Sequence, residues 1–307
     1  MPSVAFLGPL GTFHEQALLT QPDLAQLELM PLPSIPAVLA AVDHEEADLG
    51  FAAVENAIEG SVNVTLDTLA FERELLIQRE VVIGVQLSFL VPPGVALSDV
   101  RRVASFPVAT AQCRRFLSEK LPDVEVVAVN STAEAARLVG EEGRGDSAAI
   151  GTRLAGELYG LEVLETDVED HPDNETRFVL VARHGVPAPT GHDKTSIVCF
   201  QHADRPGSLL GILQEFAARA INLARLESRP TKRGLGDYCF FIDLEGHVAD
   251  EVVADSLRDL KSKLADVRFL GSYPAAGDHG PSRRRDADVA WRAADVWITD
   301  LRRQIRF

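Results

Sequence analysis

The sequence has few cysteines and no long apolar run. Its three cysteines lie far apart and form no CxxC pair, at Cys113, Cys199 and Cys239. This spacing excludes a disulfide framework and a cysteine-based zinc site, so we expect reduced core thiols in a cytoplasmic protein. No stretch of about 18 uncharged apolar residues occurs, so we expect no membrane-spanning helix. The first residues include no basic segment, and we expect no secretory signal.

Basic residues are also scarce relative to acidic ones. The chain has 30 Lys and Arg against 46 Asp and Glu, a formal net charge of −16. Such a surface repels phosphate backbones, so we expect no nucleic-acid partner. An anionic ligand then needs a local group of hydrogen-bond donors. With 307 residues, of which 46% are apolar, the chain is long enough for two domains with a core each.

Short apolar runs alternate with amphipathic segments in the first 182 residues. Helices are predicted at residues 34–41, 109–121 and 132–141. Strands are predicted at residues 4–7, 27–30, 49–54, 80–91, 102–105, 124–127, 148–150 and 178–182. This alternation is typical of an α/β domain and predicts parallel sheets covered by helices.

A stretch rich in Pro and Gly, residues 184–193, predicts a linker. After it, residues 194–273 have the order strand, helix, strand, strand, helix, strand, which predicts a ferredoxin-like βαββαβ unit. These elements are expected at residues 195–201, 208–218, 222–229, 238–245, 250–264 and 267–273. Residues 274–307 form a tail, in which we expect a packed helix.

Four polar segments lie next to predicted strands. The first, residues 8–13, joins a strand to a helix through Gly8 and Gly11. Glycines permit a tight turn, and a helix N-terminus offers unpaired N–H groups that suit a carboxylate or phosphate. The alternative is an ordinary turn in which Thr12 caps the helix.

The second and third segments each follow a predicted strand. Residues 54–62 include Glu55 and Asn56, at the sheet edge where ligands bind in open α/β folds. A simple turn explains these residues equally well. Residues 105–113 include Ser105, for which a helix cap is the simpler interpretation, and Gln112, which faces either way.

The fourth segment, residues 174–178, contains Thr176 and Arg177 before a predicted strand. An Arg side chain can bind a carboxylate through two N–H groups while the neighbouring hydroxyl donates a hydrogen bond. A surface charge is the alternative for Arg177. No single segment decides between these interpretations.

Taken in order, the four segments closely resemble the signature segments of prephenate dehydratases. Two further segments resemble the phenylalanine-binding motifs of the ACT regulatory domain of that family: Arg205-Pro206-Gly207-Ser208-Leu209 and Glu227-Ser228-Arg229-Pro230. The resemblance implies a bilobed catalytic domain over residues 1–183, similar to type II periplasmic binding proteins. One lobe comprises residues 1–77 with 165–183, and the other 78–164. The ACT domain then spans residues 194–273.

The resemblance also implies roles for individual residues. By this resemblance, Thr176 is expected to provide the essential catalytic hydroxyl. The other groups expected at the catalytic and substrate-binding site are Arg177, Asn56, Ser105, Thr12, Gly11, Glu55 and Gln112. The sequence departs from the family pattern at Ala57, where Ser is frequent, and at Phe106, where His is common. A scheme that needs that hydroxyl or imidazole does not apply to this chain.

The implied activity is a lyase reaction that converts prephenate to phenylpyruvate with loss of water and CO2. Aromatisation drives this reaction, so we expect no cofactor and no metal. Feedback regulation by phenylalanine is expected through the ACT domain, which pairs into a homodimer or homotetramer. The expected effector contacts are the two ACT motifs together with Asn222.

Two other functions remain open from the sequence. A bilobed fold also supports a non-enzymatic solute-binding or sensor protein. A dehydratase acting on arogenate, in which an amine replaces the keto group of the substrate, is the second alternative.

Overall fold

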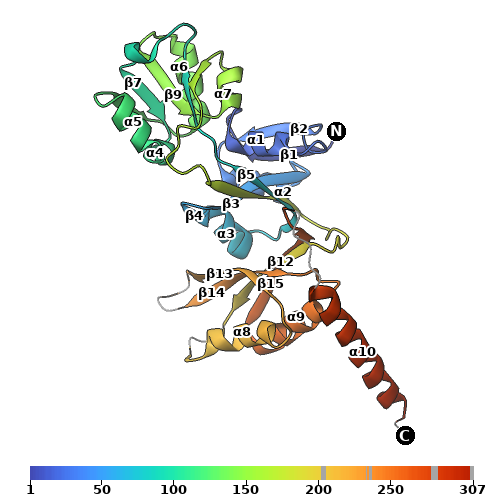
Figure 1. The fold of residues 1–307 in the computed structure, drawn as a ribbon. Helices are drawn as coiled ribbons and strands as arrows, with labels where there is room; N and C mark the ends of the chain where they lie inside the picture. Colours follow the sequence, from blue (N-terminus) through green and yellow to red (C-terminus); the bar gives the residue numbers. More distant parts are fainter. Residues whose placement is uncertain (202–204, 233, 235–236, 278–282, 305–307) are drawn as a thin grey trace. The chain divides into compact units, whose positions relative to one another are not determined.

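The chain forms two compact units (Figure 1). The computed structural model describes all residues except 202–204, 233, 235–236, 278–282 and 305–307. The first unit comprises Met1–Thr68 and Val81–Val181, and the second comprises Leu69–Glu80 and Ala182–Phe307. Residues 69–80, which the predicted boundaries assign to the catalytic domain, therefore group with the C-terminal unit.

The first unit contains two sheets. The first sheet has the strand order β2-β1-β3-β11-β5, with the short β4 paired to β3. Its strands are β1 (Ser3–Leu7), β2 (Glu28–Leu32), β3 (Leu49–Asn56), β4 (Gly60–Ser61), β5 (Leu76–Gly84) and β11 (Glu175–Ala182). Its helices are α1 (Phe13–Leu19), α2 (Ile35–Asp43) and α3 (Asn63–Asp67). Phe6 and Phe51 pack with Leu18 of α1 in one apolar core.

The second sheet has the strand order β10-β6-β9-β7-β8. Its strands are β6 (Ser88–Val91), β7 (Arg102–Ser105), β8 (Glu125–Ala128), β9 (Ser147–Gly151) and β10 (Glu162–Glu165). The helices are α4 (Pro107–Ala111), α5 (Arg114–Lys120), α6 (Thr132–Glu142) and α7 (Arg153–Leu158). Phe89 packs in a core with Leu117 of α5, whereas its neighbour Leu90 packs in a core with Ala136 of α6. Helices therefore cover both faces of this sheet, because successive strand residues point to opposite sides.

The prediction of parallel sheets is correct for only part of each sheet. β1 pairs in parallel with β2 and β3, and β7 with β8 and β9. However, β11 is antiparallel to β3, and β6 is antiparallel to β9 and β10. The antiparallel strands are those next to the two passages between the sheets, from β5 to β6 and from β10 to β11.

The prediction of one strand over residues 80–91 is also wrong. β5 ends at Gly84 and β6 begins at Ser88 in the other sheet. Val85 and Leu87 in the connection are buried, so the apolar run continues through the break. Their N–H groups bond outside the strand ladder, to the Asn174 carbonyl at 2.7 Å and to Glu169 Oε2 at 2.8 Å.

The helix predicted over residues 109–121 is likewise two helices. α4 ends at Ala111 and α5 begins at Arg114. The Asp170 N–H donates to the Gln112 carbonyl at 2.6 Å, and the Arg115 N–H donates to Asp170 Oδ1 at 3.1 Å. These long-range bonds hold the break in place.

The second unit has a four-stranded sheet in the order β13-β14-β12-β15, and the paired strands are antiparallel. Its elements are β12 (Asp193–Phe200), α8 (Ser208–Ala217), β13 (Leu223–Pro230), β14 (Tyr238–Glu245), α9 (Glu251–Lys263), β15 (Asp266–Pro274) and α10 (Arg283–Arg303). Ile212 of α8 and Leu260 of α9 pack in one core with Ile242 of β14. The predicted ferredoxin-like βαββαβ unit, and with it the predicted α/β fold class, is confirmed.

Residues 69–80 contact this sheet. Arg268 Nη1 donates to the Ala70 carbonyl at 2.8 Å, and Lys194 Nζ pairs with Glu80 Oε1 at 2.8 Å. A Cβ atom at Gly271 would lie 2.5 Å from the Ile77 carbonyl oxygen, so the close approach requires glycine there. Part of the predicted tail, residues 278–282 and 305–307, lies outside the described residues.

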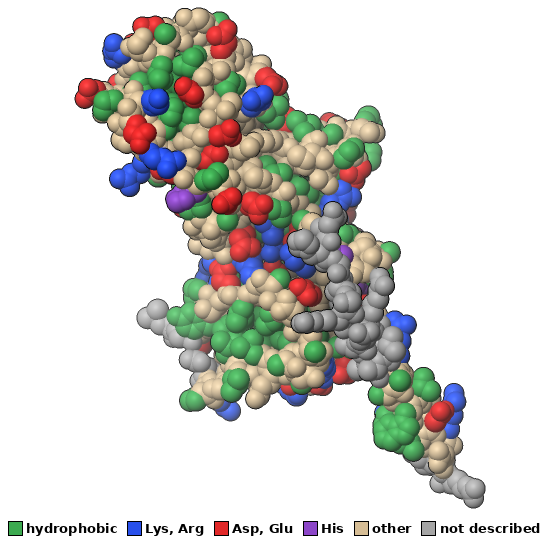
Figure 2. Space-filling model, viewed as in Figure 1, with side chains coloured by type: hydrophobic (Ala, Val, Ile, Leu, Met, Phe, Trp, Pro, Cys, Tyr) green, Lys and Arg blue, Asp and Glu red, His purple; other side chains and the backbone are tan. Residues whose placement is uncertain are grey.

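Among the described residues, no helix is both long and apolar enough to cross a bilayer. The same residues contain no group of three or more His, Cys, Asp or Glu side chains arranged to hold a metal ion. On the face drawn in Figure 2, acidic and basic side chains are interspersed.

Candidate active site

Strands β3 and β11 bring the second and fourth polar segments together. In their antiparallel register, Thr176 lies opposite Asn56, and Arg177 lies opposite Glu55. Arg177 Nη1 lies 3.4 Å from Glu55 Oε2, and the Arg177 side chain is only 12% exposed. A guanidinium that is mostly withdrawn from water binds carboxylates more strongly than an exposed one.

The orientation of the Asn56 side-chain amide is fixed by a turn. β3 and β4 form a hairpin through residues 57–59, and Gly60 has a φ of +79°, which favours glycine. Asn56 Oδ1 accepts the N–H groups of Ile58 at 3.0 Å and Glu59 at 2.9 Å. Because backbone N–H groups can only donate, the oxygen of this amide faces the turn and the NH2 group faces β11.

The Asn56 NH2 group meets acceptors from the fourth segment. Nδ2 lies 2.9 Å from Thr176 Oγ1, 2.9 Å from Asn174 Oδ1 and 3.2 Å from the Glu175 carbonyl oxygen. Thr176 Oγ1 therefore accepts a hydrogen bond from Asn56.

Gln112 connects the third segment to the other two. It stands at the end of α4 and is buried. Its Nε2 donates to Glu59 Oε1 at 3.2 Å, and its Oε1 accepts from Asn174 Nδ2 at 3.2 Å. Three of the four predicted segments thus meet in one polar cluster, which consists of Asn56, Glu59, Gln112, Asn174 and Thr176.

The Ser105 hydroxyl is not brought into this cluster. Ser105 is completely buried, and its Oγ donates to the Ile150 carbonyl at 2.8 Å. The cap interpretation of Ser105 is wrong, because α4 has Phe106 at its N-cap and no side-chain cap bond. The structure gives this hydroxyl a role inside the second sheet.

The hydrogen-bond donors of Gly11 and Thr12 in the first segment also bond to groups inside the protein. The Gly11 N–H donates to Glu15 Oε2 at 2.5 Å, so a buried carboxylate already holds the donor that we assigned to a substrate anion. Thr12 caps α1 through the Glu15 N–H at 3.5 Å, and its hydroxyl donates to the Leu7 carbonyl at 3.0 Å. For Thr12, the structure favours the cap over the anion contact.

Three residues at or near the site were missed by the sequence analysis. Asn174 and Glu59 lie within the polar segments, but nothing in the pattern distinguished them from their neighbours. His14 follows the first segment; its Nε2 accepts the Ala53 N–H at 3.3 Å, and its ring meets the Phe178 ring edge-on at 5.0 Å. Burial lowers the pKa of His14 to about 3, so this imidazole is neutral at physiological pH.

The two departures from the family pattern leave the polar cluster intact. Ala57 takes part through its backbone, since its N–H donates to the Glu175 carbonyl at 2.8 Å. Phe106 is 39% exposed. No hydrogen bond of the cluster depends on a side chain at either position.

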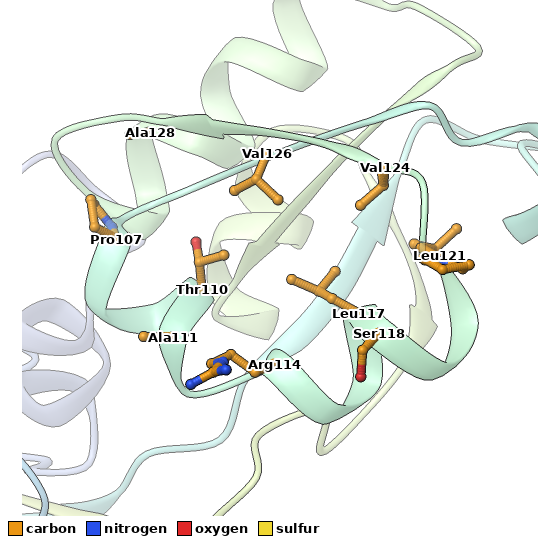
Figure 3. Close-up of a pocket in the computed structure, with 11 residues that line it drawn as sticks. Pro107, Thr110, Ala111, Arg114, Leu117, Ser118, Leu121, Val124, Val126 and Ala128 are labelled. Carbon is orange, nitrogen blue, oxygen red and sulfur yellow. The ribbon is translucent and has the colours of Figure 1, made fainter.

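A cavity of about 440 Å³ lies between helices α4 and α5 and strand β8 (Figure 3). Its lining is mainly apolar, with Leu117, Leu121 and Val126 among the side chains in view. None of the predicted substrate-binding residues lines it. This cavity is therefore separate from the polar cluster.

Comparison with known proteins gives the family. The sequence profile described as Prephenate dehydratase matches residues 4–186, and the profile described as ACT domain matches residues 195–262. The chain belongs to the prephenate dehydratase family. The predicted lyase activity, conversion of prephenate to phenylpyruvate with loss of water and CO2, is confirmed.

Individual relatives are similar to this chain over nearly its whole length. A protein of Mycolicibacterium vanbaalenii named Prephenate dehydratase is 48% identical, over 89% of this chain and 91% of the relative. The crystal structure of prephenate dehydratase from Arthrobacter aurescens in complex with L-Phe is 40% identical, with a TM-score of 0.89 and coverage of 98% and 99%. A structure described as GqqA, a novel type of quorum quenching acylase, is 31% identical, with a TM-score of 0.79 and coverage of 89% and 98%.

In the ACT domain of this prephenate dehydratase family member, the predicted effector residues fall into two groups. The turn before α8 forms the first: Arg205, Gly207 and Ser208 line a cavity of about 530 Å³, with the Ser208 hydroxyl donating to the Arg205 carbonyl at 2.8 Å. Gly207 has a φ of +86° at the N-cap of α8. Pro206 and Leu209 belong to the same turn and helix.

The second group lies on and next to β13. Glu227 pairs with Arg225 and with Arg229, the latter at 3.3 Å. Asn222 Nδ2 donates to Glu245 Oε1 at 2.8 Å. Along β13 the odd-numbered residues are half-buried, whereas the even-numbered ones, which include Ser228 and Pro230, are exposed.

Proposed function

We propose that the polar cluster binds prephenate and that Thr176 donates a hydrogen bond to the departing ring hydroxyl. In this reaction the bond to the ring carboxylate breaks and its electron pair enters the ring. CO2 is released, the C–O bond of the ring hydroxyl breaks at the same time, and the hydroxide takes up a proton from the solvent and leaves as water. A donor aimed at the departing oxygen stabilises the charge that develops there.

The polarity of the cluster supports a donor role for Thr176. Asn56 presents its NH2 group to Thr176 Oγ1, so that the oxygen acts as an acceptor toward Asn56. A threonine hydroxyl has one proton, which this bond does not use. That proton is then available for the substrate. A threonine is too weak an acid for full proton transfer near neutral pH, so the hydroxyl acts as a positioned donor.

Arg177 is proposed to bind a carboxylate of the dianionic substrate. A guanidinium has five N–H donors in a rigid fork, and it can hold Glu55 and a substrate carboxylate together. Burial of the Arg177 side chain supports this role. Gly11, Thr12 and Ser105 are proposed as positioning groups, because their donors are engaged inside the protein.

Regulation by phenylalanine is proposed through the ACT domain, supported by the Arthrobacter aurescens relative crystallised with L-Phe. The turn at Gly207 offers backbone N–H groups for a carboxylate, and Glu227 offers a partner for an ammonium group. Pairing of ACT domains between copies of the chain in a homodimer or homotetramer would supply both groups to one ligand.

A cytoplasmic location is proposed as well. All three cysteines are buried, and no disulfide joins them. Burial raises the pKa of Cys113 and of Cys199 to about 12, so both remain unreactive thiols. These properties suit a reducing compartment.

The direct test of the proposed function is turnover of prephenate and arogenate side by side. We expect phenylpyruvate to form from prephenate, as followed by its absorbance, and arogenate to turn over more slowly. Turnover of arogenate alone would contradict the substrate assignment.

A further inference from the structure

The hydrogen bonds of the polar cluster form a closed ring that begins and ends at Glu59. The Glu59 N–H donates to Asn56 Oδ1 at 2.9 Å, and Asn56 Nδ2 donates to Asn174 Oδ1 at 2.9 Å. Asn174 Nδ2 donates to Gln112 Oε1 at 3.2 Å, and Gln112 Nε2 donates to Glu59 Oε1 at 3.2 Å. Every bond of the ring therefore runs in the same direction.

Glu59 fixes this direction at both ends. Its backbone N–H can only donate, and an ionised carboxylate can only accept. An amide in the middle of the ring can be turned around only if its neighbours turn too. Asn174 is 2% exposed and Gln112 is 8% exposed, so a reversed amide would leave buried donors facing donors.

We propose that Glu59 is a positioning residue whose carboxylate sets the direction of the Gln112 and Asn174 amides. Asn174 Oδ1 then accepts from Asn56 Nδ2 and keeps the Asn56 NH2 group, which the turn already directs toward β11, beside Thr176. This inference rests on the proposed donor role of Thr176. Glu59 acts through Asn174 and Gln112 and does not touch the reacting atoms. The ring also joins α4 of the second sheet to β3 and β11 of the first, so that the direction is imposed across the two lobes.

Replacement of Asn174 by Asp tests the direction, because a carboxylate at position 174 can accept from Asn56 but cannot donate to Gln112. A carboxylate oxygen at position 174 then faces Gln112 Oε1. Both atoms are acceptors, so the hydrogen bond between these two residues is lost. The two acceptors repel each other, so the carboxylate at position 174 moves away from Gln112 and draws the Asn56 NH2 group away from Thr176. We expect Asn174→Asp to lower kcat about 10²-fold with little change in KM, the effect of a misplaced transition-state donor. Glu59→Gln alone keeps an acceptor oxygen, and its loss should stay within about tenfold.

The double variant distinguishes direction from bulk structure. With Glu59→Gln and Asn174→Asp together, Gln112 can turn around, donate to Asp at 174 and accept from Gln at 59. The repulsion between positions 174 and 112 is then removed, the Asn56 NH2 group stays beside Thr176, and kcat should return to within about tenfold of the wild-type value. A double variant no more active than Asn174→Asp alone would overturn the proposal.

Two controls complete the experiment. Glu175 has an exposed side chain next to position 174, so Glu175→Gln in the Asn174→Asp background removes a nearby charge without altering the ring. Equal recovery with this control would mean that charge alone matters, and would overturn the proposal. Thr176→Val is measured alongside: if it keeps full activity, the donor role of Thr176 is wrong, whereas an inactive Thr176→Val with no recovery in the double variant contradicts only the ring.

Discussion

At the residue scale, the side chains of the site are held by bonds whose direction is dictated by groups that can only donate or only accept. Asn56 illustrates this: two backbone N–H groups fix its oxygen, and its NH2 group is left for Thr176. A catalytic hydroxyl that always accepts from one side is prepared to donate on the other.

His14 gives a prediction for the pH dependence of stability. The pKa of His14 is about 3 in the folded chain and near its ordinary value of 6.5 in the unfolded chain, so between these values the unfolded chain binds more protons. The free energy of unfolding should therefore fall as pH falls through this window, by about 2 kcal/mol from pH 7 to pH 5. Urea denaturation at both pH values measures it.

The matched control is His14→Gln, whose oxygen can still accept the Ala53 N–H. This variant should lose about 2 kcal/mol less than the wild type over the same pH range. Equal losses in both proteins would show that His14 is not responsible.

Sequence reasoning found the site residues in part. Thr176, Asn56 and Gln112 were named and lie in the polar cluster, whereas Arg177 and Glu55 were named and pair with each other one position along the same two strands. Thr12 and Ser105 were also named, but their hydroxyls donate to backbone carbonyl oxygens inside the protein. A sequence motif does not show whether a hydroxyl faces a ligand or bonds to a carbonyl oxygen. Asn174 was overlooked for the same reason, since its importance lies in contacts with residues about 60 and 120 positions away.

At the element scale, the sequence predicted most strands and helices, and it failed where an apolar pattern continued through a break. The connection between β5 and β6 is as buried as the strands that it joins, so periodicity gives no sign of it. The break between α4 and α5 depends on a bond from Asp170, which lies far along the chain. β11 pairs antiparallel with β3 where the chain re-enters the first sheet after forming the second, and local periodicity does not show this either.

Thr152 offers a prediction at this scale, because it caps α7 and joins the two lobes. Its Oγ1 accepts the Ala155 N–H at 2.9 Å and donates to the Gly11 carbonyl at 2.6 Å, and the residue is fully buried. Thr152→Val removes the cap and leaves a buried carbonyl unsatisfied, so the free energy of unfolding should fall by about 2–4 kcal/mol.

Urea denaturation measures this loss, with Thr152→Ser as the control that keeps both bonds. We expect Thr152→Ser to lose about 1 kcal/mol or less, the cost of one buried methyl group. Equal stability of the Val variant and the wild type would contradict the role of Thr152.

At the scale of the whole molecule, the proposed regulation assigns the response to phenylalanine to the ACT domain. We expect L-phenylalanine to lower the rate of prephenate turnover and to change the assembly size of the full chain. Glu227→Ala should remove both responses and leave the basal rate unchanged, since Glu227 lies in the ACT domain. Turnover and sedimentation with and without L-phenylalanine measure these effects.

Glu119→Ala, an exposed glutamate of the first unit, is the matched control and should respond as the wild type does. A Glu227→Ala protein that keeps the full response would remove Glu227 from the effector site.

The central claim is that the Thr176 hydroxyl assists departure of the ring hydroxyl of prephenate, and the comparison of Thr176→Val with Thr176→Ser tests it most directly. In the Val variant Asn56 Nδ2 keeps two acceptors, Asn174 Oδ1 and the Glu175 carbonyl, so the site should remain folded. We predict that kcat for phenylpyruvate formation falls by about 10²–10³ in Thr176→Val and stays within about tenfold of wild type in Thr176→Ser. A folded Thr176→Val protein with near wild-type kcat would contradict the claim.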